Sequence, residues 1–505
     1  MTQRSRLGPG FRTWLRNDPA VRTALLAGDE VEVEASSYAE NDFLLDFLMS
    51  SGLWEILVSL RPRGLRKDNG KPWRALNGLE VLRELARVDR VAHCGRVISD
   101  TRLMLLAGFN ASEIQRARHR DGLVVTPETL SNHLSRIAPR DAVASFYEHV
   151  ALLQQRGWAG RGVYAADGHD ITFPHARGWQ GMGQVGCAHG YKMVLVTRVE
   201  PLPERIVAFA LGPLQTSEHV LLRMALRELE RRVGPLRRMI QTLVLDRGYW
   251  GARFLLGLRR RHGLHFVTRA QHEGLGCVTD ADALVKEQSP LRVCEDRSRL
   301  GRIEVHLRAV DGVPLFDDHK REVGTVNMVV ADEFDMHGQP LLFDDGRPRR
   351  FHYVTDEPVE RDPYEPRRHY LHRWVVENEG FRNLTQRWSL DVPAGRNLAA
   401  IVARLVNVLV LANAESIVSE LFPGAWQEER ERLRMLGAPG RIGGRPALAA
   451  YTEQGQLGLL SVQDYAQIVT QRERHRLARE LLAAQQRGED IETLLRRVSG
   501  ESPTQ

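Results

Sequence analysis

Three acidic residues stand where they could do chemistry together. Asp167 lies in the run AADGHD, Asp246 follows the apolar run LVL, and Glu377 lies in YLHRWVVENEGF. The first two acids each follow an apolar, strand-like run, so each is predicted to end a buried β-strand. A carboxylate in such a place is costly unless a charged group binds it. The sequence therefore predicts that these acids have a charged partner.

Glu377 shares its predicted helix with Tyr370 and Arg373, at spacings of four and seven residues from the glutamate. Residues three and four apart lie along one helix face, so all three are predicted to share a face. A carboxylate beside an arginine and a tyrosine hydroxyl suits a phosphate group held near a metal ion. Each pattern alone also has an ordinary explanation, as a turn or cap residue or as a solvated helix face. Asp170, three residues after Asp167, is a rival for its role.

The elements that must position these acids change in character along the chain. Residues 1–155 carry apolar residues at helical spacing, and a helix predicted to start at Thr126 is either part of a helix-turn-helix or an ordinary amphipathic helix. Residues 156–270 follow the order β-β-β-α-β-α-β, and residues 271–362 are predicted to form an antiparallel β insertion. Residues 363–415 begin with the helix of Glu377, and residues 416–505 are predicted to be helical.

Composition limits the classes of protein to which the chain can belong. With 505 residues, 43% of them hydrophobic, it can bury the cores of several domains, and its net charge of +6 permits a polyanionic partner. Its four scattered cysteines form no CxxC pair, which argues against a zinc site or a disulfide framework. The N-terminus lacks an apolar signal core, and the apolar run at 398–414 is interrupted by Arg404 and Asn407. That run is shorter than the ~20 residues of a membrane span, so a soluble protein is expected.

With these residues in this order, the chain resembles the DDE transposases of bacterial insertion sequences. That family commonly has its first aspartate as Asp-Gly on the first strand and its second as Asp-Arg-Gly-Tyr after a later strand. Its glutamate lies in a Tyr-x2-Arg-x3-Glu-x6-Lys signature. The matching residues here are Asp167-Gly168, Asp246-Arg247-Gly248-Tyr249, Tyr370, Arg373 and Glu377. The resemblance covers about residues 120–415 and departs from the signature at Leu384, which stands at the lysine position; Arg382 or Arg387 are the candidates to replace that lysine.

The resemblance implies an α/β fold with a ribonuclease H-like, retroviral-integrase-like core. This core would be a mixed five-stranded sheet with flanking helices, interrupted by the β insertion. A helical N-terminal domain, a candidate for binding DNA ends, would precede the core, and a helical C-terminal region would follow it. The corresponding residues are 1–155 for the N-terminal domain, 156–270 for the first part of the core, 271–362 for the insertion, 363–415 for the completion of the core, and 416–505 for the C-terminal region.

The resemblance also implies a metal-dependent chemistry. Asp167, Asp246 and Glu377 would be catalytic residues that hold Mg²⁺ or Mn²⁺, two ions per site, because hard cations prefer oxygen ligands. The expected contacts to DNA phosphates are Tyr370, Arg373, Arg247, Lys192 and Arg387. The expected activity is strand cleavage at transposon ends and strand transfer into target double-stranded DNA, by a homodimer in the bacterial cytoplasm at the nucleoid and with no membrane partner. The alternatives are a non-catalytic DNA-binding or inhibitory derivative and a host nuclease of the same fold.

Overall fold

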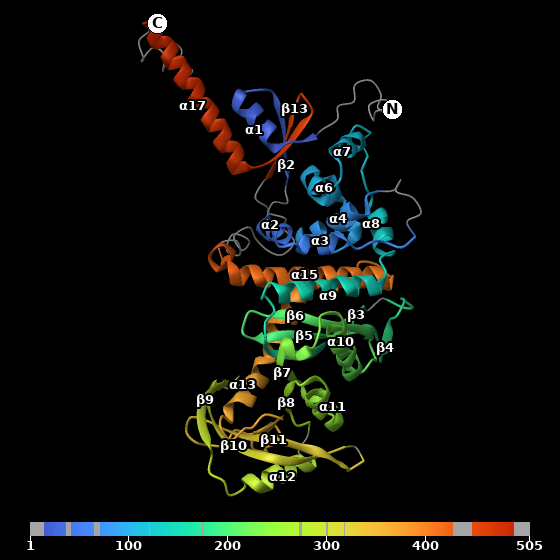
Figure 1. Cartoon of the computed structure of the whole chain (residues 1–505), viewed down its shortest axis with the longest axis vertical. Coiled ribbons are helices and arrows are strands. Elements are labelled where there is room, and N and C mark those ends of the chain that lie inside the picture. Colours follow the sequence, from blue (N-terminus) through green and yellow to red (C-terminus); the bar gives the residue numbers. More distant parts are fainter. Residues whose placement is uncertain are drawn as a thin grey trace. The chain divides into compact units, whose positions relative to one another are not determined.

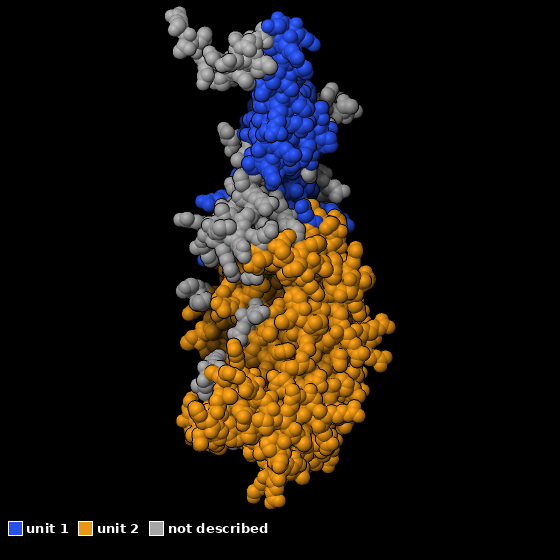
Figure 2. Space-filling view, turned by 90° about the vertical axis from the view of Figure 1, so that its left-hand side faces the viewer, with its two compact units in different colours: residues 1–46, 57–133, 428–505 blue, residues 47–56, 134–427 orange. Residues whose placement is uncertain are grey.

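The chain forms two compact units, each built from separated stretches of sequence. The computed structural model describes residues 15–36, 42–64, 71–120, 122–173, 176–271, 275–298, 301–317, 319–427 and 447–488. Unit 1 comprises Met1–Asp46, Leu57–His133 and Glu428–Gln505, and unit 2 comprises Phe47–Ile56 and Leu134–Gln427 (Figure 2). The two ends of the chain therefore belong to the same unit.

A four-stranded sheet in unit 1 joins the N-terminal and C-terminal segments. Its strand order is β1-β14-β13-β2. The strands are β1 (Leu15–Arg16), β2 (Val31–Ser36), β13 (Ala447–Thr452) and β14 (Gln456–Ser461). Helices α1 (Asp18–Ala27) and α17 (Val462–Gln486) contribute Val21, Leu25 and Ile468 to a core that includes Ala450 and Leu460. The sequence interpretation expected helices in both terminal regions and did not predict these four strands.

In the described part of unit 1 the remaining regular elements are helices, as the apolar spacing predicts. Its helices include α4 (Trp73–Leu85), α5 (Gly95–Ser99), α6 (Thr101–Ala107) and α7 (Ala111–Arg118). Helix α8 (Pro127–Leu134) begins directly after Thr126, whose hydroxyl accepts a hydrogen bond from the backbone N–H of Thr129 at 3.3 Å. That contact is a side-chain N-cap, so the helix start predicted at Thr126 is confirmed.

Unit 2 is built on a large mixed sheet. The strands in its first part are β3 (Gly162–Thr172), β4 (Gly183–Val185), β5 (Ala188–Glu200), β6 (Arg205–Pro213), β7 (Ile240–Leu245) and β8 (His265–Arg269). Strands β6, β5 and β3 pair antiparallel, whereas β3, β7 and β8 pair parallel. Helices α10 (Glu218–Arg232) and α11 (Ala252–Gly257) provide the expected connections, so the β-β-β-α-β-α-β order is present, with the short β4 in addition. This arrangement is consistent with a ribonuclease H-like core.

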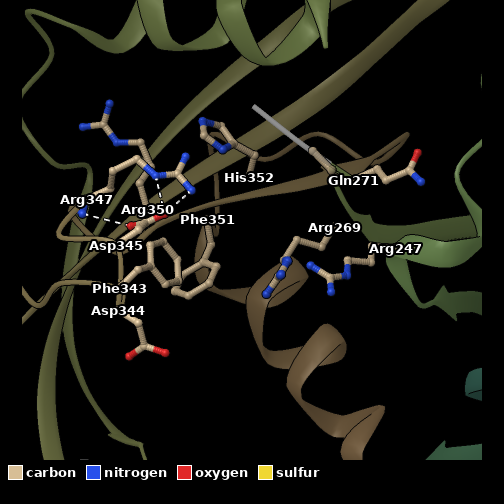
Figure 3. Close-up of a pocket in the computed structure, with 11 residues that line it drawn as sticks. Arg247, Arg269, Gln271, Phe343, Asp344, Asp345, Arg347, Arg350, Phe351 and His352 are labelled. Carbon is tan, nitrogen blue, oxygen red and sulfur yellow. Dashed lines mark hydrogen bonds and ion pairs between the residues drawn. The ribbon is translucent and has the colours of Figure 1, made fainter. Parts of the chain in front are cut away.

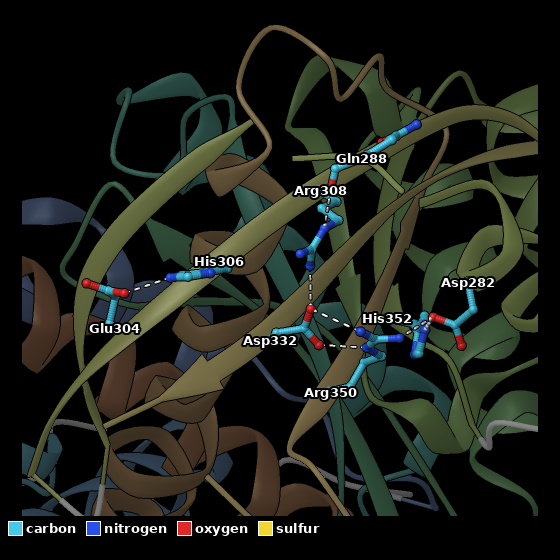
Figure 4. A network of polar contacts seen from close by, with 8 residues as sticks. All are labelled: Asp282, Gln288, Glu304, His306, Arg308, Asp332, Arg350 and His352. Atoms are coloured by element: carbon cyan, nitrogen blue, oxygen red, sulfur yellow. Dashed lines mark hydrogen bonds and ion pairs between the residues drawn. The ribbon is translucent and has the colours of Figure 1, made fainter. Parts of the chain in front are cut away.

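The β insertion continues this sheet. Strands β9 (Arg292–Ser298), β10 (Gly301–Phe316), β11 (Glu322–Phe334) and β12 (Arg350–Thr355) are antiparallel neighbours, and β12 pairs with β8. A helix that the sequence interpretation missed, α12 (Gly276–Val285), packs on β10 and β11. Asp332 bridges Arg308 and Arg350, while Asp282 of α12 bonds His352 at 2.9 Å (Figure 4). The Asp332 contacts link β10, β11 and β12 to one another, and the Asp282 contact joins α12 to β12.

Two long helices cover the sheet beside β6. Helices α9 (Pro139–Gln155) and α15 (Leu398–Leu421) lie side by side (Figure 1). Helix α15 is long and apolar enough to cross a membrane by length and composition, but 94% of its apolar window is buried inside the protein. Its Asn413 side chain hydrogen-bonds both backbone groups of Ile206 and also bonds His149 of α9. Helix α15 is therefore part of the protein core and packs against the sheet.

Candidate active site

The two aspartates lie at the same level on neighbouring parallel strands. Ala166 of β3 is the register partner of Leu245 of β7, so Asp167 and Asp246 directly follow this last matched pair. Asp246 comes after the end of β7, as expected, but β3 runs on to Thr172. The prediction that Asp167 ends its strand is therefore wrong: beyond Asp167, β3 loses β7 but keeps its pairing with β5.

Glu377 lies near the two aspartates, on a segment that begins as an α-helix and continues as a π-helix. Helix α13 (Tyr364–His372) is followed by Arg373 as its C-cap and then by a π-helical segment, Val376–Phe381. Such wide turns occur frequently at functional sites. Arg373 Nη1 still lies 3.2 Å from Glu377 Oε1, so the expected shared face survives the change of helix type.

Arg373 connects all three acids. Its Nη1 donates to Asp167 Oδ2 at 2.8 Å, and its Nη2 lies 3.4 Å from Asp246 Oδ1. With the contact to Glu377, one buried guanidinium faces carboxylates from β3, from the residue after β7 and from the π-helical segment. Residues separated by up to 210 positions are thus brought together around a single cation.

Burial controls the electrostatics of this cluster. The pKa of Asp167 is raised to about 7, chiefly by burial. Arg373 and the Gly168 N–H act to lower this pKa, and the charges of Glu377 and Asp246 add to the rise. Tyr370 donates its hydroxyl to Asp246 Oδ1 at 3.1 Å, and burial together with the Asp246 charge raises the pKa of Tyr370 to about 12. The tyrosine therefore remains a hydrogen-bond donor at neutral pH.

The donor set suits a hard divalent cation, because it consists of carboxylate oxygens. Within the described ranges, however, no group of three His, Cys, Asp or Glu side chains is arranged so that it could hold a metal ion. The guanidinium of Arg373 lies between the acids instead. The oxygen ligands of these residues fit a divalent cation chemically.

Asp170 has a different partner from Asp167. Its side chain is 53% exposed and lies 3.3 Å from Lys192 Nζ on β5. Lys192 also lies 3.5 Å from Glu218 Oε1 at the start of α10. Lys192, which is an expected DNA contact, is therefore paired with two acids that are not among those around Arg373.

The candidates for the missing signature lysine lie elsewhere. Leu384 is buried, and Arg382 donates to Gln386 at 3.2 Å. Arg387 Nε lies 2.7 Å from Glu415 Oε2, and its guanidinium faces the Trp388 and Trp426 rings. The structure therefore gives Arg387 an acidic partner on α15, separate from the three acids.

A cavity rich in arginine is lined by residues that follow β7 and β8 and by residues of the β insertion. It has a volume of about 480 Å³ and includes Arg247, the residue after Asp246 (Figure 3). Arg269, at the end of β8, also lines it and is near enough to Tyr370 to affect its pKa. The Arg269 guanidinium lies 5.1 Å from the centre of the Phe351 ring. Its lining holds four arginines and two aspartates, Asp344 and Asp345. The cavity therefore offers a net positive charge and an aromatic surface, both of which suit nucleic acid.

Glu218 and Arg269 were missed by the sequence interpretation. A Cβ built on Gly168 would lie 2.6 Å from the Glu218 carboxylate, so this glycine allows the glutamate to approach β3 closely. Burial raises the pKa of Tyr249 well above its ordinary value, and Glu218 is the largest electrostatic contributor. An acid in the first turn of a helix is ordinary in sequence, and no spacing pattern marks Glu218 as part of a site.

A comparison with known protein families identifies the family of the chain. A model of the family described as Transposase DDE domain matches residues 158–414, which is more than half of the chain. No curated protein matches the chain. The matched range begins just before β3 and ends within α15, so it includes all three acids and the whole inserted β region. The chain therefore belongs to the DDE transposase family, whose members are catalytic DNA transposases that generally use divalent metal ions.

Proposed function

We propose that Asp167, Asp246 and Glu377 are the catalytic carboxylates, and that they hold Mg²⁺ or Mn²⁺, two ions per site. The observation that supports this assignment is their convergence around Arg373 from three different elements. Bound divalent ions would supply an activated water or 3′-hydroxyl and stabilise the leaving oxygen in phosphodiester chemistry. The reactions would be strand cleavage at transposon ends and strand transfer into target DNA.

The neighbouring residues have separate tasks in this proposal. Tyr370 orients the Asp246 carboxylate through its hydroxyl, which lies 3.1 Å away. Arg247 is exposed and, with Tyr370, Arg373 and Lys192, would contact phosphates near the cleaved bond. Arginine suits this task because its planar fork matches phosphate oxygens. Phosphate contacts of this kind position the duplex and do not read its sequence.

Arg387 is proposed as a further phosphate contact under one condition. Its guanidinium is paired with Glu415, so it can reach DNA only if that ion pair opens. The arginine-lined cavity beside Arg247 would attract the DNA backbone independently of Arg387.

We propose that strands β6, β5, β3, β7 and β8 form the five-stranded ribonuclease H-like sheet. Their mixed pairing supports this proposal. In the functional division, residues 156–270 and 363–415 would carry the catalytic core, residues 271–362 the insertion, and residues 1–155 the recognition of DNA ends. Residues 416–505 would form the C-terminal region, which joins the N-terminal segment through the β13–β2 pairing. A homodimer acting in the bacterial cytoplasm would hold the two transposon ends.

Isosteric substitution of the acids tests the catalytic assignment. Asp246→Asn keeps an oxygen that can accept the Tyr370 hydroxyl but removes the charge that a divalent ion needs. We expect cleavage of a plasmid carrying the DNA that flanks the coding region to fall by about a thousandfold with Mg²⁺, since metal-ion catalysis supplies several kcal/mol. Binding of the same DNA, measured by gel shift, should remain.

The matched control for the first strand is Asp170→Asn. Asp170 lies on the same strand as Asp167 but pairs with Lys192 and not with Arg373. Asp167→Asn should abolish cleavage, whereas Asp170→Asn should retain most of it. Wild-type cleavage by Asp167→Asn or Asp246→Asn would contradict the assignment, as would loss of cleavage in Asp170→Asn alone.

A further inference from the structure

The buried guanidinium of Arg373 occupies the place where positive charge is needed. We infer that Arg373 is a stand-in cation in the metal-free enzyme, and that a divalent ion binds only when Arg373 releases the acids and becomes free to engage a DNA phosphate. The inference rests on the proposed function, because it takes Asp167, Asp246 and Glu377 as the metal site. It adds that metal binding and the position of Arg373 are coupled.

The first reason for this inference is the balance of charge around Arg373. Three carboxylates meet around one arginine, and like charges at such distances repel unless a cation lies among them. Asp167 is buried, so water cannot replace that cation effectively. Arg373 therefore stabilises an arrangement of acids that would otherwise spread apart in the absence of metal.

Competition for the same oxygens is the second reason. Arg373 nitrogens lie 2.8 Å from Asp167, 3.2 Å from Glu377 and 3.4 Å from Asp246. Mg²⁺ needs its oxygen ligands at about 2.1 Å in an octahedral arrangement. In the described part of the chain no three acids are arranged for this. The ion and the guanidinium cannot both hold these carboxylates.

The surroundings of Arg373 are suited to its release. Its Nε is buried, and no hydrogen-bond partner for it is found among the described residues. An unsatisfied buried donor is unfavourable, so the position of Arg373 among the acids leaves one donor to be gained elsewhere. A phosphate can accept several such donors at once. Arg373 also lies between α13 and the π-helical segment Val376–Phe381, where the regular helical hydrogen-bond pattern changes.

The inference predicts a measurable coupling. If a metal site is accessible for only a fraction of the time, its apparent affinity for the ion is reduced by that fraction. Removing the stand-in charge should therefore tighten divalent-ion binding in the absence of DNA. A role of Arg373 as an ordinary structural ion pair predicts the opposite, because its loss would disorder the acids.

The test is titration of the full-length protein with Mn²⁺ alone, followed by calorimetry or by the Mn²⁺ electron paramagnetic resonance signal. We expect Arg373→Gln to bind Mn²⁺ about tenfold more tightly than wild type, since freeing a charged hydrogen bond is worth about one order of magnitude. Arg373→Lys keeps a charge but lacks the fork that reaches several acids, so it should show a smaller gain.

The matched control is Arg367→Gln. Arg367 lies on α13, is equally buried, and pairs with Asp296 and Glu333, not with the three acids. This variant should be destabilised without a gain in Mn²⁺ affinity. An equal gain in Arg367→Gln would show that general loosening, and not release of the acids, tightens the site, and would overturn the inference.

The remaining outcomes separate the inference from the function on which it rests. If Asp246→Asn binds Mn²⁺ as wild type does, the proposed metal site is wrong. If Asp246→Asn loses Mn²⁺ while Arg373→Gln binds it no better than wild type, the metal site stands and the stand-in role is refuted. Should Arg373→Gln fail to fold, the Arg373→Lys titration decides, and unchanged or weaker binding refutes the inference.

Discussion

Removal of one hydroxyl, in Tyr370→Phe, tests how the Asp246 carboxylate is held. The Tyr370 hydroxyl donates to Asp246 Oδ1 at 3.1 Å, and its ring is buried against the Tyr353 ring, with 5.5 Å between the centroids. A hydrogen bond to a charged group contributes about 1.5–3 kcal/mol. Because one third of the Asp246 side chain is exposed to water, the lower end of that range applies. We therefore expect a loss of about 1.5 kcal/mol in the free energy of unfolding.

The effect on catalysis should be larger than this loss of stability alone explains. Without the hydroxyl, Asp246 keeps a long hydrogen bond from the Gly248 N–H, at 3.5 Å, and its 3.4 Å contact to Arg373. The contact to Arg373 is the one that a divalent ion would replace. Poor positioning of a reacting group by even 1 Å lowers rates by up to about a hundredfold. We expect at least about a tenfold fall in the single-turnover cleavage rate, equivalent to about 1.4 kcal/mol in the barrier. The assay uses Mg²⁺ and the flanking DNA, at protein concentrations that saturate binding.

Tyr353→Phe is the matched control. The Tyr353 hydroxyl accepts a hydrogen bond from Arg367 Nη1 at 2.9 Å, and its ring is as deeply buried as that of Tyr370. Its loss should lower the free energy of unfolding by a similar amount in urea and leave the cleavage rate near that of wild type. Equal cleavage losses in the two variants would refute the reasoning, as would wild-type cleavage by Tyr370→Phe.

Two further predictions concern the framework of unit 2. His149 is fully buried, and burial with the nearby Arg205 charge lowers its pKa to about 3, so unfolding takes up a proton below pH 6.5 and stability falls as pH falls. Between pH 7 and 5 the free energy of unfolding in urea should drop by about 2 kcal/mol more in wild type than in His149→Gln, whereas exposed His475→Gln should behave as wild type. Gly190→Ala should lower the free energy of unfolding by at least about 3 kcal/mol, because the new Cβ would lie 2.0 Å from a backbone carbonyl oxygen of β3. Gly160→Ala, which meets no atom within 4 Å, is its control, and equal stability of the two would contradict the clash.

Local patterns in the sequence were sufficient for much of the catalytic unit. The apolar runs around Asp167 and Asp246 predicted their strands, and the spacing of Tyr370, Arg373 and Glu377 predicted a shared face. These predictions succeed because strand and helix periodicity depends on neighbouring residues. The apolar run from Leu398 likewise belongs to a buried helix in the structure.

Pairing between distant segments could not be predicted in this way. The strand at Val31–Ser36 pairs with Ala447–Thr452, more than 400 residues away, and neither run carries a turn that points to its partner. The extension of β3 beyond Asp167 has the same origin, because it depends on the antiparallel partner β5 and not on local sequence. Register and strand length are set by which segments meet.

Side-chain chemistry and periodicity are local properties, so the order of residues alone indicates which residues could form the acid site and on which kinds of element they lie. The match of Ala166 with Leu245 across β3 and β7, which places the two aspartates side by side, exists only in the folded chain. Only the tertiary structure also decided that Arg373 lies among the acids, while Arg387 pairs with Glu415. These outcomes depend on burial and on charge pairing between segments far apart in the chain, and no spacing pattern encodes them.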